Sequence, residues 1–217
     1  MENTQSKKIE ETRKKLLTSD EFVFSELKKL QLLNELKSEI RYGQEREVGD
    51  YGDSVAEHIF GMHIAFQYFL PLENPSFDWD KSKMLEMITL HDIDEVITGD
   101  TIGYDKTDAH RKAEVLAMKE ILQKMPQHMT DNSKALLDEY HERTTIEAKF
   151  VKAIDKIETL IYLFEPKGKE LLHRMKTTFD QNASIKVQFF EEFPVIMHFY
   201  EVCSKRMCEE GYFVEPT

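Results

Sequence analysis

The chain has 217 residues, with 41 Asp and Glu against 29 Lys and Arg, so its formal net charge at pH 7 is -12. This length can bury a sizeable core without disulfides or a structural metal, so we expect any metal to be functional. The acidic balance argues against a dedicated nucleic-acid binder, because polymer phosphates are usually met by a basic surface. A small phosphorylated ligand needs only local positive charge, which a divalent metal and an arginine can supply.

The spacing of the two cysteines and the length of the apolar runs indicate in which cellular compartment the protein is found. Cys203 and Cys208 lie five residues apart in an expected helix, about 140° out of phase, so they are not expected to bridge each other. The first twenty residues are charged, and the longest nearly apolar run, "IFGMHIAFQYFL", is too short to cross a bilayer. We therefore expect a soluble protein of the reducing cytoplasm.

Apolar residues recur at helical spacing through most of the chain, which predicts an all-α protein. After a charged N-terminal segment, a helix is expected over 21–39. The turn-rich "YGQEREVGDYGDS" ends it, and Asp53 or Ser54 is expected to cap a helix over 55–70 that is apolar nearly all round and hence central. The candidate buried positions of the first helix are Phe22, Leu27, Leu30, Leu33 and Leu36.

Asp80 is expected to cap the next helix, over 81–97, which stops near Gly99. The last two of the remaining helical segments are expected to be peripheral or to face a partner. We expect a single globular domain over 1–217, since no repeat, linker or clear boundary appears. The remaining segments are 108–125, 131–142, 145–164, 168–179 and 183–209.

The stretch "MITLHDIDEVITGD", residues 87–100, begins apolar and ends acidic. If it is helical, His91 and Glu95 lie one turn apart on one face, with Asp92 beside His91. The apolar turn would then pack into the core and the acidic turn would face a cleft. An "HD" dipeptide alone carries little information, so this site needs partners elsewhere in the chain.

Partners are available on two other expected helices. His58 lies in the most apolar helix, where it is either a metal ligand or a core histidine bonded to a backbone carbonyl; His63 competes with it. Asp155 interrupts the buried stripe of "FVKAIDKIETLIYLF". A buried carboxylate is costly unless it is paired or binds a metal, so Asp155 is either a ligand or the partner of a flanking lysine, Lys152 or Lys156.

Two imidazoles and two carboxylates on three helices form a plausible ligand set. Such a set suits Mn²⁺, Fe²⁺, Co²⁺ or Ni²⁺, tolerates Zn²⁺, and leaves coordination positions for water and substrate. The four residues are His58, His91, Asp92 and Asp155.

The stretches "SVAEH", "HD" followed by "EVITGD", and "AIDKIE" resemble the HD-domain metal-dependent phosphohydrolases, and most closely their 5'-deoxynucleotidase branch. The resemblance covers about residues 41–164 and implies a helical HD-domain bundle with peripheral N- and C-terminal helices. It implies that Glu95 positions or activates the attacking water and that Asp100 contacts the sugar or supports proton transfer. The implied metal ligands are His58, His91, Asp92 and Asp155.

The branch also has an arginine and an aromatic residue one loop before the first histidine, which "IRYGQ" matches with Arg41 and Tyr42. This loop is about two residues longer here, so Arg46 is a rival for binding the phosphate. The chain also lacks the proline that some bacterial members have after "GD". Arg41 could instead be an ordinary surface cation, and Asp100 a turn residue.

We therefore expect a phosphomonoesterase that hydrolyses deoxyribonucleoside 5'-monophosphates with one divalent metal ion. The alternatives are an HD-type hydrolase of another small phosphate ester or phosphodiester, and a non-catalytic nucleotide-binding module. A homodimer is expected by likeness to the family. The apolar stretch "FFEEFPVIMHFY" is its candidate interface, or else part of an ordinary core.

Overall fold

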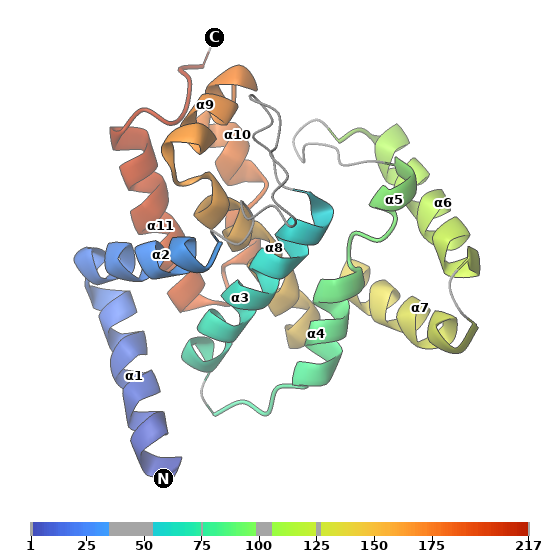
Figure 1. Cartoon of the computed structure of the whole chain (residues 1–217), viewed down its shortest axis with the longest axis horizontal. Coiled ribbons are helices and arrows are strands. Elements are labelled where there is room, and N and C mark those ends of the chain that lie inside the picture. Colours follow the sequence, from blue (N-terminus) through green and yellow to red (C-terminus); the bar gives the residue numbers. More distant parts are fainter. Residues whose placement is uncertain (1, 35–53, 75, 99–105, 125–126, 217) are drawn as a thin grey trace, which may run out of the picture. The chain divides into compact units, whose positions relative to one another are not determined.

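A computed structural model describes residues 2–34, 54–74, 76–98, 106–124 and 127–216. Every regular element in these ranges is a helix, so the all-α prediction is confirmed (Figure 1). The elements are α1 (Glu2–Thr18), α2 (Asp20–Asn34), α3 (Val55–Glu73), α4 (Lys81–Leu90), α5 (Glu95–Thr98), α6 (Asp108–Lys124), α7 (Gln127–Glu142), α8 (Ile146–Leu163), α9 (Pro166–Arg174), α10 (Phe179–Ser184), the 3-10 helix η4 (Val187–Phe189) and α11 (Pro194–Glu209).

Contacts within the chain divide it into two compact units. Unit 1 comprises Met1–Phe77 and Ala153–Thr217, and unit 2 comprises Asp78–Lys152. Helix α8 begins in unit 2 and continues into unit 1. The single domain expected over 1–217 stays a prediction.

Unit 1 is built around α3, which packs against α1, α2 and α11. The predicted cap is Ser54, whose side chain accepts a hydrogen bond from the backbone of Glu57, while the Glu57 carboxylate accepts one from the backbone N–H of Ser54. Within the core the rings of Phe69 and Phe199, both fully buried, meet edge to face with centroids 5.3 Å apart. Such a pair adds about 1 kcal/mol to the stability that burial itself provides, so α3 has the central place that its apolar surface predicts.

Unit 2 has a smaller core between α4, α6 and α7. Met118, Leu122 and Leu137 form its buried centre, and Leu90 and Ile93 pack against them. The predicted cap Asp80 accepts a hydrogen bond of 3.0 Å from the backbone of Lys83 at the start of α4. These contacts anchor the apolar half of α4, the helix that leads into the acidic stretch.

The N-terminal prediction is only partly correct. The charged segment expected to precede the first helix is itself helical, and α1 buries Leu16 completely. Ser19 separates α1 from α2 and accepts a hydrogen bond from the backbone of Phe22 with its side chain. Of the predicted buried positions, Leu27 is buried and Phe22 is partly buried. The side chains of Leu30, Leu33 and Leu36 lie outside the described residues.

The single helix expected over 183–209 is wrong, because the chain forms α10, η4 and α11 there. Pro194 cannot continue a preceding helix, but it is tolerated at the first turn of α11, where its missing N–H costs nothing. The helix expected over 168–179 is α9, which ends at Arg174.

The C-terminal helices are less peripheral than expected. Most of the apolar side chains in "FFEEFPVIMHFY" are buried inside unit 1, where α11 packs on α1, α2 and α3. This stretch is therefore core rather than the expected dimer interface. Its buried residues are Phe190, Phe193, Val195, Ile196, Phe199 and Tyr200.

The two cysteines are unpaired, as expected, with Cys203 buried and Cys208 exposed. Among the helices that the structure describes, none is long and apolar enough to cross a membrane.

Candidate metal centre

The helix expected over 81–97 ends early. Helix α4 stops at Leu90, a turn follows, and α5 begins at Glu95. The break places the carboxylate of Glu95 in the first turn of α5, where the positive end of a helix favours negative charge. The turn is closed by tight hydrogen bonds, such as that of 3.0 Å from the N–H of Glu95 to the carbonyl of Asp92. His91 and Glu95 are thus joined by a turn and do not share one helix face.

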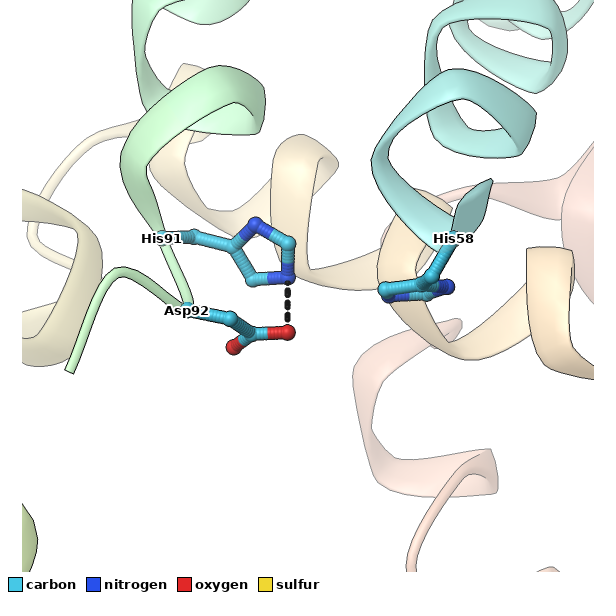
Figure 2. A group of neighbouring side chains, drawn as sticks. All are labelled: His58, His91 and Asp92. Atoms are coloured by element: carbon cyan, nitrogen blue, oxygen red, sulfur yellow. Dashed lines mark ion pairs between the residues drawn. The ribbon is translucent and has the colours of Figure 1, made fainter. Parts of the chain in front are cut away.

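His91 is the C-cap of α4, and its side chain is fully buried. Its Nδ1 lies 3.0 Å from the carbonyl oxygen of Ile88, and since that oxygen only accepts, Nδ1 carries the proton. This directs the lone pair of Nε2 toward Asp92, whose Oδ2 is 2.8 Å away (Figure 2). A lone pair and a carboxylate oxygen this close both favour a cation between them. The ring of His91 is held edge to face against Tyr140, at 5.5 Å.

The rest of the acidic turn lies beside one lysine. Lys106 forms an ion pair of 2.7 Å with Glu114. Burial lowers the pKa of Lys106, but this pair and the nearby charges of Glu95 and Asp92 outweigh burial and raise that pKa above its ordinary value. Asp94, which the sequence did not single out, is buried, and its burial raises the pKa of its carboxyl. Unit 2 therefore gathers a negative potential around His91.

His58 lies in the first turn of α3, where the Ser54 cap fixes the start of the helix (Figure 2). Its Nδ1 is 2.7 Å from Oε2 of Glu158, and its Nε2 is 3.5 Å from Oδ1 of Asp155. Burial lowers the pKa of His58, but the hydrogen bonds and charges of Asp155 and Glu158 outweigh burial and raise that pKa well above 6.5. Within unit 1, folding thus brings the first predicted histidine together with the last predicted aspartate.

Both interpretations of Asp155 find support. Its side chain is 8% exposed and faces His58, and its Oδ2 also lies 3.0 Å from Nζ of Lys156, one of the flanking lysines. The two oxygens are therefore shared between the imidazole and the ammonium. The competing histidine, His63, is half-buried further along α3, and its burial lowers its pKa. Of the two histidines of α3, His58 is therefore the one that faces Asp155.

The comparison with known proteins identifies the family of this chain. The HD domain family matches residues 33–197, which extend into both units. The chain belongs to the HD domain family. The resemblance seen over about 41–164 is thereby confirmed and lengthened.

Two relatives of this HD domain protein are 5'-deoxynucleotidases. The mouse 5'-deoxynucleotidase HDDC2 is 29% identical over 142 residues, which are 64% of this chain and 68% of that protein. The 5'-deoxynucleotidase hdd1 of Schizosaccharomyces pombe is 33% identical over 147 residues, which are 64% of this chain and 71% of the yeast protein.

The crystal structure of a predicted metal-dependent phosphohydrolase from Magnetospirillum magnetotacticum MS-1 superposes with a TM-score of 0.65. It covers 86% of this chain and 96% of its own, at 19% sequence identity. At this identity the likeness concerns the HD-domain fold.

Each histidine–aspartate pair, taken within its own unit, has donor atoms that suit a divalent metal ion. Ligand atoms about 2.1 Å from an ion and at right angles to each other are about 3 Å apart. The separations of 2.8 Å at His91 and Asp92 and of 3.5 Å at His58 and Asp155 are close to this value. His58, His91 and Asp92 each offer one metal-binding atom.

Two buried charged residues of unit 1 had not been expected at this site. Glu158 holds Nδ1 of His58, and a signal for it was present, since it lies four residues after Ile154 on the buried stripe of α8. Lys186 is also buried, close enough to Asp155 and Glu158 to sense their charges. No periodicity around Lys186 indicates this, because the residue follows the short α10.

The pocket of about 360 Å³ beside α5 and α6 is lined by apolar side chains such as Ile97 and Leu116, with Glu114 and Glu120 among them. A phosphate would meet like charges there, so we do not expect this pocket to bind the phosphate. Four predicted site residues lie outside the described residues: Arg41, Tyr42, Arg46 and Asp100.

Proposed function

We propose that this HD domain protein is a metal-dependent phosphomonoesterase that hydrolyses deoxyribonucleoside 5'-monophosphates to a deoxyribonucleoside and phosphate. The observation that carries the hydrolytic chemistry is that two histidines, each with an aspartate beside it, present Nε2 toward a carboxylate oxygen. The substrate class is supported by the 5'-deoxynucleotidases of mouse and fission yeast that the chain resembles.

Four side chains bind one divalent ion in this proposal: His58 and Asp155 of unit 1, and His91 and Asp92 of unit 2. The support is the family match across 33–197 and the donor chemistry of each pair. Two imidazoles and two carboxylates suit Mn²⁺, Co²⁺, Fe²⁺ or Ni²⁺ and tolerate Zn²⁺. When bound, such an ion lowers the pKa of water and polarises a phosphoryl oxygen.

Side chains of the protein orient the attacking water and bind the substrate in this proposal. Glu95 accepts a hydrogen bond from the attacking water and orients it toward phosphorus. Arg41 holds the phosphate oxygens as charge develops on them, with Arg46 as its rival, and Tyr42 packs beside the substrate. Asp100 accepts a hydrogen bond from the 3'-hydroxyl of the sugar. No serine or cysteine nucleophile is required.

We also propose the domain organisation, the cellular compartment and the oligomeric state of the enzyme. The chain forms one HD domain over 1–217, and the extent of the family match supports this. The free thiols of Cys203 and Cys208 are in keeping with the reducing cytoplasm. A homodimer remains our proposal because closed dimers are the commonest assemblies of such proteins. Its interface must use a surface other than the buried "FFEEFPVIMHFY" stretch.

Phosphate release over a panel of nucleotides, assayed with each of these metals in turn, tests the function. A 3'-phosphate placed against Asp100 meets like-charge repulsion, so 5'-monophosphates should be strongly preferred. A pocket that merely excludes one hydroxyl discriminates by about a hundredfold, so the preference for deoxyribose should be moderate.

Matched 5'-deoxy, 5'-ribo and 3'-deoxy monophosphates supply the kcat/KM values that decide the assignment. Equal turnover of ribonucleotides would contradict the deoxynucleotidase assignment and leave a phosphohydrolase. Cleavage of other phosphate esters or phosphodiesters alone would favour the second candidate. Binding of nucleotides without turnover under any metal would identify a non-catalytic module.

A further inference from the structure

Unit 1 buries a carboxylate and an ammonium that the proposed reaction does not use. Glu158 and Lys186 are 1% and 2% exposed. Glu158 is bonded to His58, whereas Nζ of Lys186 makes no hydrogen bond to any atom that the structure describes. An ammonium buried without a partner costs several kcal/mol. Folding would not retain this arrangement without some compensation.

The hydrogen bond between His58 and Glu158 determines which nitrogen of His58 can bind a metal. Oε2 of Glu158 lies 2.7 Å from Nδ1, so the carboxylate accepts the Nδ1 proton. The lone pair is then on Nε2, the atom 3.5 Å from Asp155. A carboxylate behind a metal-binding histidine fixes its ring and makes it a stronger ligand.

Glu158 and Asp155 bury two carboxylates beside the imidazole of His58. Lys156 pairs with Asp155 at 3.0 Å. Lys186 is another cation of unit 1, buried and close enough to both carboxylates to sense their charges.

Lys186 meets charges of both signs from one helix, α8. Burial and the charge of Lys156 lower its pKa to about 7, although Asp155 and Glu158 oppose that shift. Of its two acidic neighbours, Asp155 is a proposed metal ligand, and Glu158 is bonded to His58, another proposed ligand. The two carboxylates therefore stabilise the ammonium group of Lys186, and the ammonium group in turn lowers the energetic cost of burying them.

We propose that Glu158 is a positioning residue that holds His58 ready to bind the metal through Nε2, and that the buried Lys186 stabilises the Glu158 carboxylate in this position through its positive charge. The inference rests on the proposed metal site. It extends that site by a carboxylate and a cation that contact neither the metal nor the substrate.

Metal affinity and the state of His58, measured without substrate, test this inference. Zn²⁺ affinity is obtained by competition with a chromogenic chelator for the full chain and for Glu158→Gln, Glu158→Ala, Lys186→Met and the double variant Glu158→Gln/Lys186→Met. Loss of a partner behind a ligand typically weakens metal binding by about 10- to 100-fold. We expect Glu158→Ala to lose most and Glu158→Gln less, because its amide oxygen still accepts the Nδ1 proton.

The double variant separates the two roles. Lys186→Met should weaken Zn²⁺ binding about tenfold in the wild-type background and have almost no effect when Glu158 is already Gln, because coupled residues are not additive. Lys83→Met and Glu139→Gln are matched controls, since these residues form an ion pair of 2.8 Å in unit 2. They should leave Zn²⁺ affinity unchanged.

Nitrogen-15 spectra of histidine in the Zn²⁺-loaded protein give a readout that a merely structural role would not move. The His58 signals, assigned by their loss in His58→Gln, should show a protonated Nδ1 and a metal-bound Nε2. The Nδ1 proton should shift in Glu158→Gln and in Lys186→Met. Lys186→Met removes a buried charge and should still fold, so it keeps the inference testable if Glu158→Ala does not.

The outcomes are distinct. Unchanged affinity in the Glu158 variants, or equal losses for Lys186→Met in both backgrounds, would overturn the inference while leaving the proposed hydrolase intact. A wild-type protein that binds Zn²⁺ with the expected variant pattern but hydrolyses no nucleotide would instead refute the proposed function alone. Absence of Zn²⁺ binding by the wild type would overturn both.

Discussion

A carboxylate oxygen of Glu73, in the last turn of α3, accepts a hydrogen bond of 2.6 Å from the backbone N–H of Ile196, near the start of α11. These residues are 123 positions apart in sequence. The bond satisfies one of the N–H groups that the first turn of a helix leaves unpaired. Glu73 is 6% exposed, and its burial raises the pKa of its carboxyl from 4.5 to about 7, against the lowering effect of this bond.

This shift predicts how stability depends on pH. Between about pH 4.5 and 7 the folded protein keeps a proton on Glu73 that the unfolded chain releases, so the free energy of unfolding falls as pH rises through this window. Glu73→Gln removes the effect because its amide does not ionise. Relative to wild type, the variant should gain up to about 3 kcal/mol between pH 5 and pH 8, from a pKa difference of about 2.5.

Urea unfolding at pH 5, 6, 7 and 8 measures this gain. The exposed Glu191, changed to Gln, is the control and should follow the wild-type profile. A constant difference between Glu73→Gln and wild type across the range would show that Glu73 is ionised in the folded protein at pH 5.

Asp155→Asn should reduce metal content and activity together. The change removes the negative charge beside Nε2 of His58 while keeping the size of the side chain. We expect metal affinity to fall by at least about tenfold. Elemental analysis and nucleotide turnover on the same sample measure both quantities. Asp138→Asn, on the exposed face of α7, should change neither, and full metal content with normal turnover in Asp155→Asn would remove this residue from the site.

Glu95→Ala should separate catalysis from metal binding. Glu95 begins α5, beyond the turn that carries the proposed ligands His91 and Asp92, and we expect it to orient water rather than to bind the ion. The variant should retain its metal, while kcat falls by about 10²- to 10⁴-fold, as for loss of a general base. Glu142→Gln, exposed at the end of α7, is the control. If the metal is lost from Glu95→Ala, then Glu95 is itself a ligand.

Arg41→Ala should impair activity more than Arg46→Ala. Arg41 is followed by the aromatic Tyr42, a pair that resembles the motif of the 5'-deoxynucleotidase branch, and an arginine on the phosphate stabilises charge in the transition state. Removal of such a donor lowers kcat/KM by about 10²-fold or more. Steady-state kinetics of both variants give the order, with exposed Arg111→Ala as the control. The reverse order would mean that the longer loop places Arg46 on the phosphate.

Local features of the sequence predicted much of the fold and of the site. The start of α3 at Ser54 and the start of α4 after Asp80 follow from capping chemistry, which acts within three or four residues. The apolar surface of α3 predicted its central place. His58 and Asp155 were candidate ligands because each is a polar residue on an apolar helix, where burial requires a partner; the structure brings these two together.

Other features depended on neighbours that are distant in sequence. The break of α4 before Asp92 was missed because apolar periodicity continues through "VIT", while a new helix start at Glu95 gains from an acidic first turn. The burial of "FFEEFPVIMHFY" was decided by packing of α11 on α1, α2 and α3.

The amino-acid sequence by itself determined that this protein is helical, where α3 and α4 begin, and which histidines and aspartates could bind a metal, because propensity, capping and periodicity act over one or two turns. Only the tertiary structure decided that Glu158 lies behind His58 and that Lys186 is buried near them. The physical reason is that burial and charge pairing are set by contacts between segments far apart in the chain, which local patterns do not encode.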